Sequence, residues 1–403
     1  MKAVPPHVLT INGGSSSIRF AIFSAGPPAR LALAGKVDRI GLRGTTLEAG
    51  GTALGRPLRR PLGAADHAAA VGRLLAWLEA QPLFGAVRAV GHRVVQGRRH
   101  AAPARLTPRL LAELRRNTPF APDHLPVEVA LIEAIRRRHP RLAQVACFDT
   151  AFHRTMPRVA RLVPIPRRFA AQGVERYGFH GLSYQFLTDE LRRIGDPAAR
   201  KGRVILAHLG NGASLAAVRD GRSIDTTMGF TPASGLVMGT RSGDLDPGLL
   251  SFLARREGVT PAAFDRMVNH ESGLLGVSGT SSDMRDLLAR EARDPRAAAA
   301  VELFCYQAAK WIGSMAAALG GVDTIVFAGG IGENSPAVRR RICAGLRFLG
   351  VTVDPRRNSR GAAIISAPRV RVRVRVIHTD EELMIARSVT RVLRLGARRS
   401  HPS

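Results

Sequence analysis

Short apolar runs separated by small polar turns open the chain and predict a β-hairpin. Val8–Ile11 is apolar, residues 12–17 are small and polar, and Ile18–Phe23 resumes the apolar run. Two apolar runs joined by such a short turn are typical of paired strands. A third strand is expected over Leu31–Ile40, after a turn that contains Gly and two Pro.

Longer amphipathic patterns follow and predict helices with short strands between them. The helices are expected at Ala64–Ala80, Pro108–Arg116 and Pro126–Arg138, and the strands at Ala86–Val90 and Val145–Phe148. Strands that alternate with helices favour an α/β fold.

The opening pattern then returns, which indicates an internal repeat. Val204–Ala207 is apolar, residues 208–214 are small and polar, Leu215–Val218 is apolar, and Arg222–Thr226 follows after a turn. At 403 residues the chain exceeds what one hydrophobic core usually fills. We therefore expect a duplicated α/β domain with a cleft between the two copies.

A third turn of the same kind comes late in the chain. Thr324–Ala328 reads as a buried strand, residues 329–334 as a Gly-rich turn, and Ser335 with Pro336 as the cap and first residue of a helix that runs to about Leu349. Glycine lets backbone N–H groups approach an anion closely, so three such turns predict phosphate binding. None fits the pattern of a P-loop.

The charge of the chain is strongly positive. The formal net charge is +29, and it comes almost wholly from arginine. These arginines are scattered, which argues against nucleic-acid binding as the function. One stretch alternates with valine and predicts a strand with one apolar face and one solvated cationic face: Arg369, Arg371, Arg373 and Arg375 with Val370, Val372, Val374 and Val376.

Cysteine usage and apolar content point to a cytoplasmic protein. The three cysteines, Cys147, Cys305 and Cys343, are far apart without metal-ligand spacing, so reduced thiols are expected. Residues 1–14 lack a signal-peptide pattern, and no window reaches about 18 uninterrupted apolar residues. Neither secretion nor membrane insertion is predicted.

Eight motifs in order along the chain resemble the acetate kinase family. They are Asn12–Ser17, Gly91–Val95, Phe148–His153, Arg176–Gly181, His208–Gly212, Thr226–Asp244, Gly329–Asn334 and Thr379–Glu382. The resemblance implies the acetate and sugar kinase, heat-shock ATPase and actin superfamily, with duplicated ribonuclease-H-like domains and a nucleotide cleft between them. It places one domain at 1–150 plus about 384–403, and the other at 151–383.

The implied reaction is ATP-dependent phosphorylation of a short carboxylic acid, acetate above all. Both reactants are anionic, so donors and cations are the main requirement. By resemblance the catalytic residues are Arg93, Asp149, His180, Asn211 and Arg241. A free carboxylate is its own nucleophile at pH 7, which leaves Asp149 to orient metal-bound water or an arginine.

The resemblance also implies the binding residues. The nucleotide is expected on Ser17, Arg19, His208, Leu209, Gly210, Asn211, Gly212, Asp283, Met284, Arg285, Gly330, Ile331, Gly332, Glu333 and Asn334. Mg²⁺ or Mn²⁺ is expected on Asn12 and Glu381, with Asp149 close by. The acid is expected on Arg93, Val95, His124, Phe179 and Pro232. A homodimer is implied as well.

Several residues depart from the family pattern. They are Arg19, Gln96, Asp123, Leu125, Leu182 and Tyr184. Asp123 would bring a carboxylate to an otherwise apolar acid pocket, which is costly unless the group is paired or solvated. Propionate or butyrate therefore remains open as the preferred acid. A basic binding protein without turnover is a third hypothesis, in which the same residues are capping, surface-paired or interior side chains.

Overall fold

The computed structural model describes residues 5–14, 16–42, 44–64 and 66–396, and the chain forms two units. Unit 1 contains the chain up to Ala151 and the segment from Asp380 onward, and unit 2 runs from Phe152 to Thr379. The chain thus leaves unit 1, builds all of unit 2, and returns to complete unit 1.

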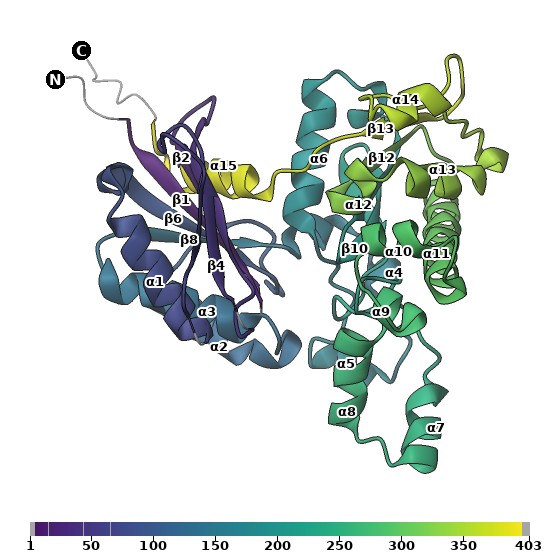
Figure 1. Cartoon of the computed structure of the whole chain (residues 1–403), viewed down its shortest axis with the longest axis horizontal. Coiled ribbons are helices and arrows are strands. Elements are labelled where there is room, and N and C mark those ends of the chain that lie inside the picture. Colours follow the sequence, from purple (N-terminus) through teal and green to yellow (C-terminus); the bar gives the residue numbers. More distant parts are fainter. Residues whose placement is uncertain (1–4, 15, 43, 65, 397–403) are drawn as a thin grey trace. The chain divides into compact units, whose positions relative to one another are not determined.

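Unit 1 is built on a mixed sheet (Figure 1). Its strands are β1 (His7–Gly13), β2 (Ile18–Ser24), β3 (Leu31–Asp38), β4 (Thr46–Gly50), β5 (Leu58–Pro61), β6 (Val87–Val94), β7 (Ala104–Arg105) and β8 (Ala143–Phe148). They lie in the order β5-β4-β3-β2-β1-β6-β8-β7. Strands β3, β2 and β1 are antiparallel neighbours, whereas β1, β6 and β8 run parallel.

Unit 2 repeats the central part of this pattern. Its strands are β9 (Arg203–Leu209), β10 (Ala213–Arg219), β11 (Arg222–Thr226), β12 (Thr324–Ala328) and β13 (Arg373–Val376), in the order β11-β10-β9-β12-β13. Here β11, β10 and β9 are antiparallel, and β9, β12 and β13 are parallel. The five strands match β3-β2-β1-β6-β8 in order and direction, so the predicted duplication is confirmed.

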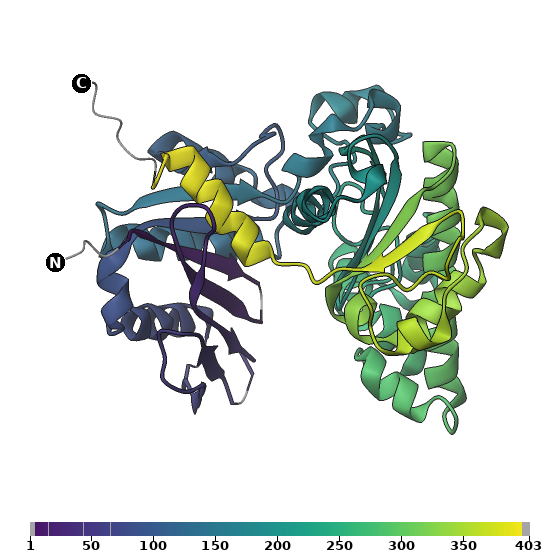
Figure 2. The ribbon, with the colours of Figure 1, turned by 90° about the horizontal axis from the view of Figure 1, so that it is seen from above.

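Helices cover both faces of the unit 1 sheet (Figure 2). They are α1 (His67–Glu79), α2 (Pro108–Arg116), α3 (Leu125–Arg138) and α15 (Glu381–Leu393), with 3-10 turns at Pro82–Ala86 and Thr118–Phe120. Asp66 caps α1 and Thr107 caps α2, each accepting a backbone N–H of the first turn. The main core lies between the sheet and α1 with α3, and α15 packs on β1 and β6.

The helices of unit 2 surround its sheet. They are α4 (Arg158–Arg161), α5 (Arg167–Ala171), α6 (Gly181–Arg193), α7 (Gly248–Glu257), α8 (Pro261–Arg266), α9 (Gly273–Ser278), α10 (Met284–Arg290), α11 (Pro295–Leu319), α12 (Gly329–Asn334), α13 (Pro336–Ala344) and α14 (Pro355–Ser359). Short turns of 3-10 or π type lie at Ala151–Thr155, Pro197–Ala199, Met267–Glu271 and Arg347–Leu349. The long helix α11 packs against β9, β10 and β11.

Two predicted elements differ in the structure. Residues 329–334, expected to be a turn, form the short helix α12, and Ser335 then caps α13 as predicted. The following helix is shorter than expected, because α13 ends at Ala344. Gly329 has φ +76°, a left-handed conformation that lets the chain turn directly from β12 into α12.

The predicted solvated cationic face of the last strand is confirmed only in part, because Arg369 and Arg371 are exposed whereas Arg375 is buried. Within β13, Arg375 is only 8% exposed, and its Nε donates to Asp196 Oδ2 at 2.6 Å. Arg373 reaches the same carboxylate at 3.3 Å. The buried Asp196 needs a cationic partner, and it draws the guanidinium of Arg375 inward, while Arg373 stays half-buried.

Two bulk features bear on the predicted thiol chemistry and membrane insertion. All three cysteines are free and buried, and burial raises the pKa of the Cys147 thiol to about 12. Such thiols are unreactive at neutral pH. Over the described ranges, we find no helix with both the length and the apolar content needed to cross a bilayer.

Gly91→Ala should destabilise the protein, because β6 and α15 are in close contact at this glycine. An added Cβ would lie 2.4 Å from Cγ2 of Ile385 and 2.6 Å from Cγ2 of Val389. Overpacking of this kind typically costs about 1–3 kcal/mol. Urea denaturation would measure the loss in unfolding free energy. Gly50→Ala in β4 is the control, since its Cβ would meet no atom within 4 Å; equal losses in both variants would contradict this account.

Candidate active site

A half-buried arginine near the end of β6 is the centre of the functional residues in unit 1. The Nε and Nη2 atoms of Arg93 both donate to Asp149 Oδ2, at 2.9 and 2.6 Å. Asp149 follows β8 directly, and its own N–H donates to the carbonyl of Val94 at 3.0 Å. The Asp149 side chain is 0% exposed and that of Arg93 is 16% exposed, so the pair is fixed with little access to water.

Two further polar residues adjoin this pair. Arg93 Nη1 donates to Asn12 Oδ1 at 3.4 Å, and Asn12 Nδ2 donates to Glu381 Oε2 at 3.1 Å. Asn12 is near the end of β1 and Glu381 is the first residue of α15. The fold therefore joins Asn12, Arg93, Asp149 and Glu381, all predicted as site residues, in one hydrogen-bonded set.

The charges in this set favour a permanently cationic Arg93. Burial opposes the charge on the guanidinium, but the carboxylates of Asp149 and Glu381 outweigh it and raise the Arg93 pKa. A fully charged, fixed guanidinium suits the binding of carboxylate or phosphoryl oxygens.

The prediction from sequence missed Glu128, which also acts on Arg93. This residue of α3 is 2% exposed, and its carboxyl oxygens lie 3.2 and 3.1 Å from the backbone nitrogen of Val95. Burial raises the pKa of Glu128 to about 8. The one signal in the sequence is that Glu128 lies among the apolar positions of the helix predicted over Pro126–Arg138.

In unit 2 a second set forms around His180. This residue has φ +58°, a left-handed conformation directly before α6. Its Nδ1 lies 2.8 Å from Ser214 Oγ, and its ring stacks on His208 with ring centres 4.4 Å apart. Tyr184, one of the departures from the family pattern, is buried with its hydroxyl 2.5 Å from the same Ser214 oxygen. Tyr184 thus supports the histidine through Ser214.

Asn211 and Gly212 lie in the turn between β9 and β10, next to this histidine. A Cβ on Gly212 would lie 3.3 Å from Arg241 Nη2 and 3.4 Å from His180 Nε2. The two side chains therefore converge on the backbone of the turn, where only glycine leaves room for a ligand atom. The backbone carbonyl of Asn211 accepts the N–H of Gly239 at 2.9 Å. Five predicted residues of unit 2 are thus brought together: His180, His208, Asn211, Gly212 and Arg241.

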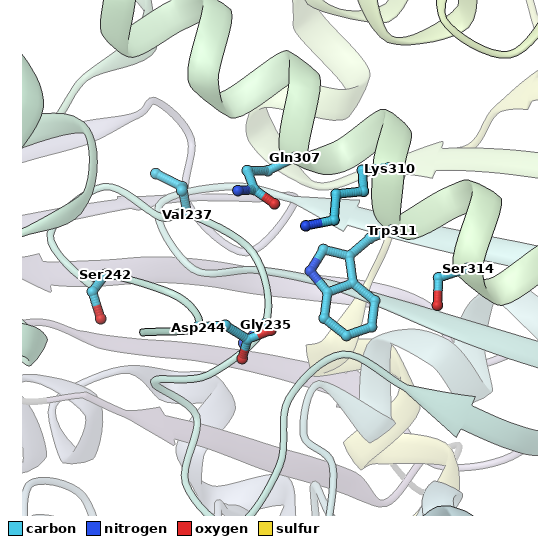
Figure 3. Close-up of a pocket in the computed structure, with 8 residues that line it drawn as sticks. All are labelled: Gly235, Val237, Ser242, Asp244, Gln307, Lys310, Trp311 and Ser314. Carbon is cyan, nitrogen blue, oxygen red and sulfur yellow. The ribbon is translucent and has the colours of Figure 1, made fainter. Parts of the chain in front are cut away.

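Arg241 lies in a loop whose ends, Gly235 and Asp244, are hydrogen-bonded to each other. Asp244 joins the loop ends, since its Oδ1 accepts the N–H of Gly235 at 2.8 Å and its own N–H donates to the Gly235 carbonyl at 3.1 Å. Arg241 Nη1 donates to the carbonyl of Pro232 at 2.8 Å. Behind the loop, against α11, lies a cavity of about 210 Å³ lined by Gly235, Val237, Ser242, Asp244, Gln307, Lys310, Trp311 and Ser314 (Figure 3).

The Gly-rich helix α12 is held by two charged side chains. Arg339 is fully buried and donates to the carbonyls of Gly332 and Glu333 at 2.8 and 2.7 Å. Glu333 accepts the N–H of Gly329 at 2.8 Å and that of Thr379 at 3.1 Å. Glu333 therefore braces the turn, while the exposed Gly330 leaves backbone groups accessible.

The other predicted nucleotide residues are distributed over both units. Asp283 caps α10 and forms an ion pair with Arg285 at 2.5 Å, and Met284 is buried. Ile331 and Asn334 lie on α12, Leu209 ends β9, and Gly210 directly follows it. In unit 1, Ser17 is half-buried before β2 and Arg19 is exposed on it.

The predicted acid-binding residues also come from both units. Val95 follows β6 and is buried, and His124 precedes α3. In unit 2 Phe179 is buried and Pro232 is half-buried. Among the departures, Leu125, Leu182 and Gln96 are buried and Asp123 is half-buried. Gln96 accepts the N–H of Arg98 at 2.8 Å, which stabilises the turn after Val95.

The oxygen donors of unit 1 can hold a divalent ion only together with water and substrate phosphates. The described residues include no group of three or more His, Cys, Asp or Glu that could hold a metal by itself. Mg²⁺, however, is commonly held by one or two protein oxygens together with water and substrate phosphates. The amide oxygen of Asn12 and the carboxylate of Glu381 are hard donors of this kind, so these residues fit such an ion.

Comparison with known proteins identifies the family. The model of the acetokinase family matches residues 7–387. Over 394 residues the chain is 46% identical to the acetate kinase of Rhodopseudomonas palustris strain TIE-1, covering 96% of this chain and 98% of that protein. It is 44% identical to the propionate kinase of Citrobacter rodentium strain ICC168, covering 96% of each.

Solved structures agree with the sequence comparisons. The acetate kinase of Porphyromonas gingivalis superposes with a TM-score of 0.86 at 36% identity, covering 96% of this chain and 100% of that one. Such relatives have the duplicated actin-like ATPase fold, which confirms the expected fold class. By sequence and by structure, the chain belongs to the acetokinase family.

Proposed function

We propose that this protein transfers the γ-phosphoryl group of ATP to the carboxylate of acetate, giving acetyl phosphate and ADP. The observation that carries the proposal is the fixed, half-buried guanidinium of Arg93, held by Asp149 at 2.6 Å in a chain of this family. A guanidinium with free N–H edges can hold a carboxylate through two hydrogen bonds.

The residues divide the work between the acid and the phosphoryl group. Arg93 binds and orients the carboxylate, whose oxygen attacks phosphorus without a general base because it is already ionised at pH 7. Asp149 holds Arg93 in place. Arg241, His180 and Asn211 donate to the oxygens of the transferring group, where negative charge develops in the transition state. The bond from phosphorus to the β,γ-bridging oxygen breaks, and ADP leaves.

Asn12 and Glu381 would hold Mg²⁺ or Mn²⁺. The ion would neutralise phosphate charge when bound. For the nucleotide phosphates, we propose the backbone of residues 208–212 and that of the exposed Gly330 on α12.

The acid pocket would use Val95, Phe179 and Pro232 as apolar walls, with His124 as a polar contact. Propionate is the second candidate, because the chain is 44% identical to a protein named propionate kinase. One extra methylene changes affinity by only about 1–3 kcal/mol, so the two acids can be close competitors.

We further propose a cytoplasmic homodimer without a nucleic-acid partner. The three free, buried cysteines support a reducing compartment. Part of the positive charge is buried inside the protein, as at Arg339 and Arg375, and is not available on the surface. This weakens the case for nucleic-acid binding. The homodimer rests on the family alone.

The decisive experiment traps acyl phosphate with hydroxylamine. Purified protein, ATP and Mg²⁺ are incubated with acetate, propionate or butyrate, and hydroxamate is measured. Acetate should give the highest kcat/KM, and excess EDTA should abolish turnover. Turnover that survives EDTA would remove the metal from the proposal, and absence of product with every acid would overturn the function.

Arg241→Ala should lower kcat about a hundredfold or more and change the KM for ATP little. The residue acts mainly on charge in the transition state, and loss of one such preorganised donor costs on the order of 3 kcal/mol. Steady-state kinetics would measure the effect. Arg255→Ala, on the exposed face of α7, is the matched control and should behave as the parent. Near-normal kcat in folded Arg241→Ala protein would exclude Arg241 from the site.

Asp123→Leu and Asp123→Asn should both lower the KM for acetate tenfold or more, with kcat nearly unchanged. Two carboxylates about 6 Å apart repel by roughly 3 kcal/mol at an effective dielectric of about 20. Removing the charge relieves that repulsion in the bound acid. Because Asn keeps the size of Asp, equal gains in both variants would identify charge as the cause. An unaltered KM in both would show that Asp123 does not face the acid.

A further inference from the structure

The buried carboxyl group of Glu128 has no role in the chemistry described above. It extends from the first turn of α3 to the end of β6, where both of its oxygens lie near the backbone nitrogen of Val95, at 3.2 and 3.1 Å. Val95 follows the last residue of β6, so its N–H lies beyond the paired part of the strand. Glu128 therefore supplies the acceptor that this buried N–H requires.

An acceptor alone does not explain a carboxylic acid at this position. The side-chain amide of Gln would also accept one N–H, without the cost of burying an ionisable group. Val95 is two residues beyond Arg93, so the group that anchors Val95 is also close to the substrate-binding guanidinium. The charge of each acts on the other: Glu128 raises the pKa of Arg93, and Arg93 opposes the upward shift of the Glu128 pKa.

The charged groups around Glu128 come from several elements. Arg93 on β6 and Asp149 after β8 act on it directly, and Glu381 on α15 acts on Arg93. Helices α1 and α2 and strand β1 also pack on α3, but the charges that shift the Glu128 pKa are those of Arg93 and Asp149. With Glu128 ionised, three carboxylates would surround one guanidinium that must bind an anion.

We propose that Glu128 is a positioning residue of the acid site, which fixes the backbone at Val95 and sets how much negative charge surrounds Arg93. This proposal rests on the assignment of Arg93 to the acid. When Glu128 is protonated, it anchors Val95 without adding charge, and Arg93 keeps its attraction for the carboxylate. When Glu128 is ionised, its negative charge offsets part of the positive charge of Arg93 and weakens the attraction between Arg93 and the carboxylate of the acid.

The direction of the pH effect follows from burial. The Glu128 pKa is raised from its ordinary 4.5 to about 8, so the folded protein carries the neutral acid at pH 7. Ionisation above about pH 8 should raise the KM for acetate, by about fivefold or more between pH 7 and 9 for a charge within several ångströms. Between pH 4.5 and 8 the folded state binds this proton more tightly than the unfolded state, so unfolding free energy falls as pH rises.

Three variants separate anchoring from charge. Glu128→Gln keeps an acceptor for Val95 and removes the ionisable group, whereas Glu128→Ala removes both. Glu133→Gln is the control on the same helix, since Glu133 pairs instead with Arg115 at the surface. Acetate and ATP kinetics would be measured from pH 6.5 to 9.5, and urea unfolding of each protein from pH 5 to 9.

Glu128→Ala should raise the KM for acetate about tenfold at pH 7, with less than a twofold change in the KM for ATP, and Glu128→Gln should recover most of the affinity. The rise in acetate KM above pH 8 should persist in the parent and in Glu133→Gln and be absent in Glu128→Gln. The stability of Glu128→Gln relative to the parent should increase with pH up to about 9.

A parental pH profile retained in Glu128→Gln would overturn the charge role, and an unchanged acetate KM in folded Glu128→Ala would overturn the anchoring role. Failure of the proposed function would look different. The parent would then form no acyl phosphate at any pH, whereas the unfolding measurements would still report the titration of Glu128.

Discussion

The ion pair between Arg93 and Asp149 is the interaction on which the functional site of unit 1 depends. A guanidinium in so dry a place is stable only beside a carboxylate, and a buried carboxylate is stable only beside a cation. Removing one partner of such a pair typically costs about 3–5 kcal/mol, because the other remains buried and charged. The pair also joins the ends of two parallel strands, and hydrogen bonds connect Arg93 to Asn12 and Asn12 to Glu381.

Both units place their polar residues by the same topological rule. In unit 1, Arg93 is near the carboxyl end of β6 and Asp149 directly follows β8, and these strands are parallel neighbours. In unit 2, His208 is near the end of β9 and Gly329 follows β12, which are also parallel neighbours. Carboxyl ends of parallel strands meet at one sheet edge, where ligands commonly bind. Duplication of the fold has therefore duplicated the placement of polar groups.

The sequence predicted most of the strands and the helices α1, α2, α3 and α13, because apolar period and capping residues are local signals. It predicted the Gly-rich turns because glycine and small polar residues mark them. It could not predict contacts that form only in the tertiary structure. These are Arg375 with Asp196, Arg339 with the carbonyls of α12, and Glu128 with Val95. Each of these buries a charged side chain, and burial depends on the tertiary structure rather than on spacing along the chain.

The late return of the chain to unit 1 affects how the protein is made. Helix α15 covers β1 and β6, with Ile385 and Val389 against Gly91, yet it is synthesised about 230 residues after unit 1 otherwise ends at Ala151. At about 5–20 residues per second, a ribosome needs roughly 10–50 s to cover that distance. During this interval the emerging sheet has an uncovered apolar face, while unit 2 can already fold. Completion of unit 1 therefore depends on the part of the chain that is made after unit 2.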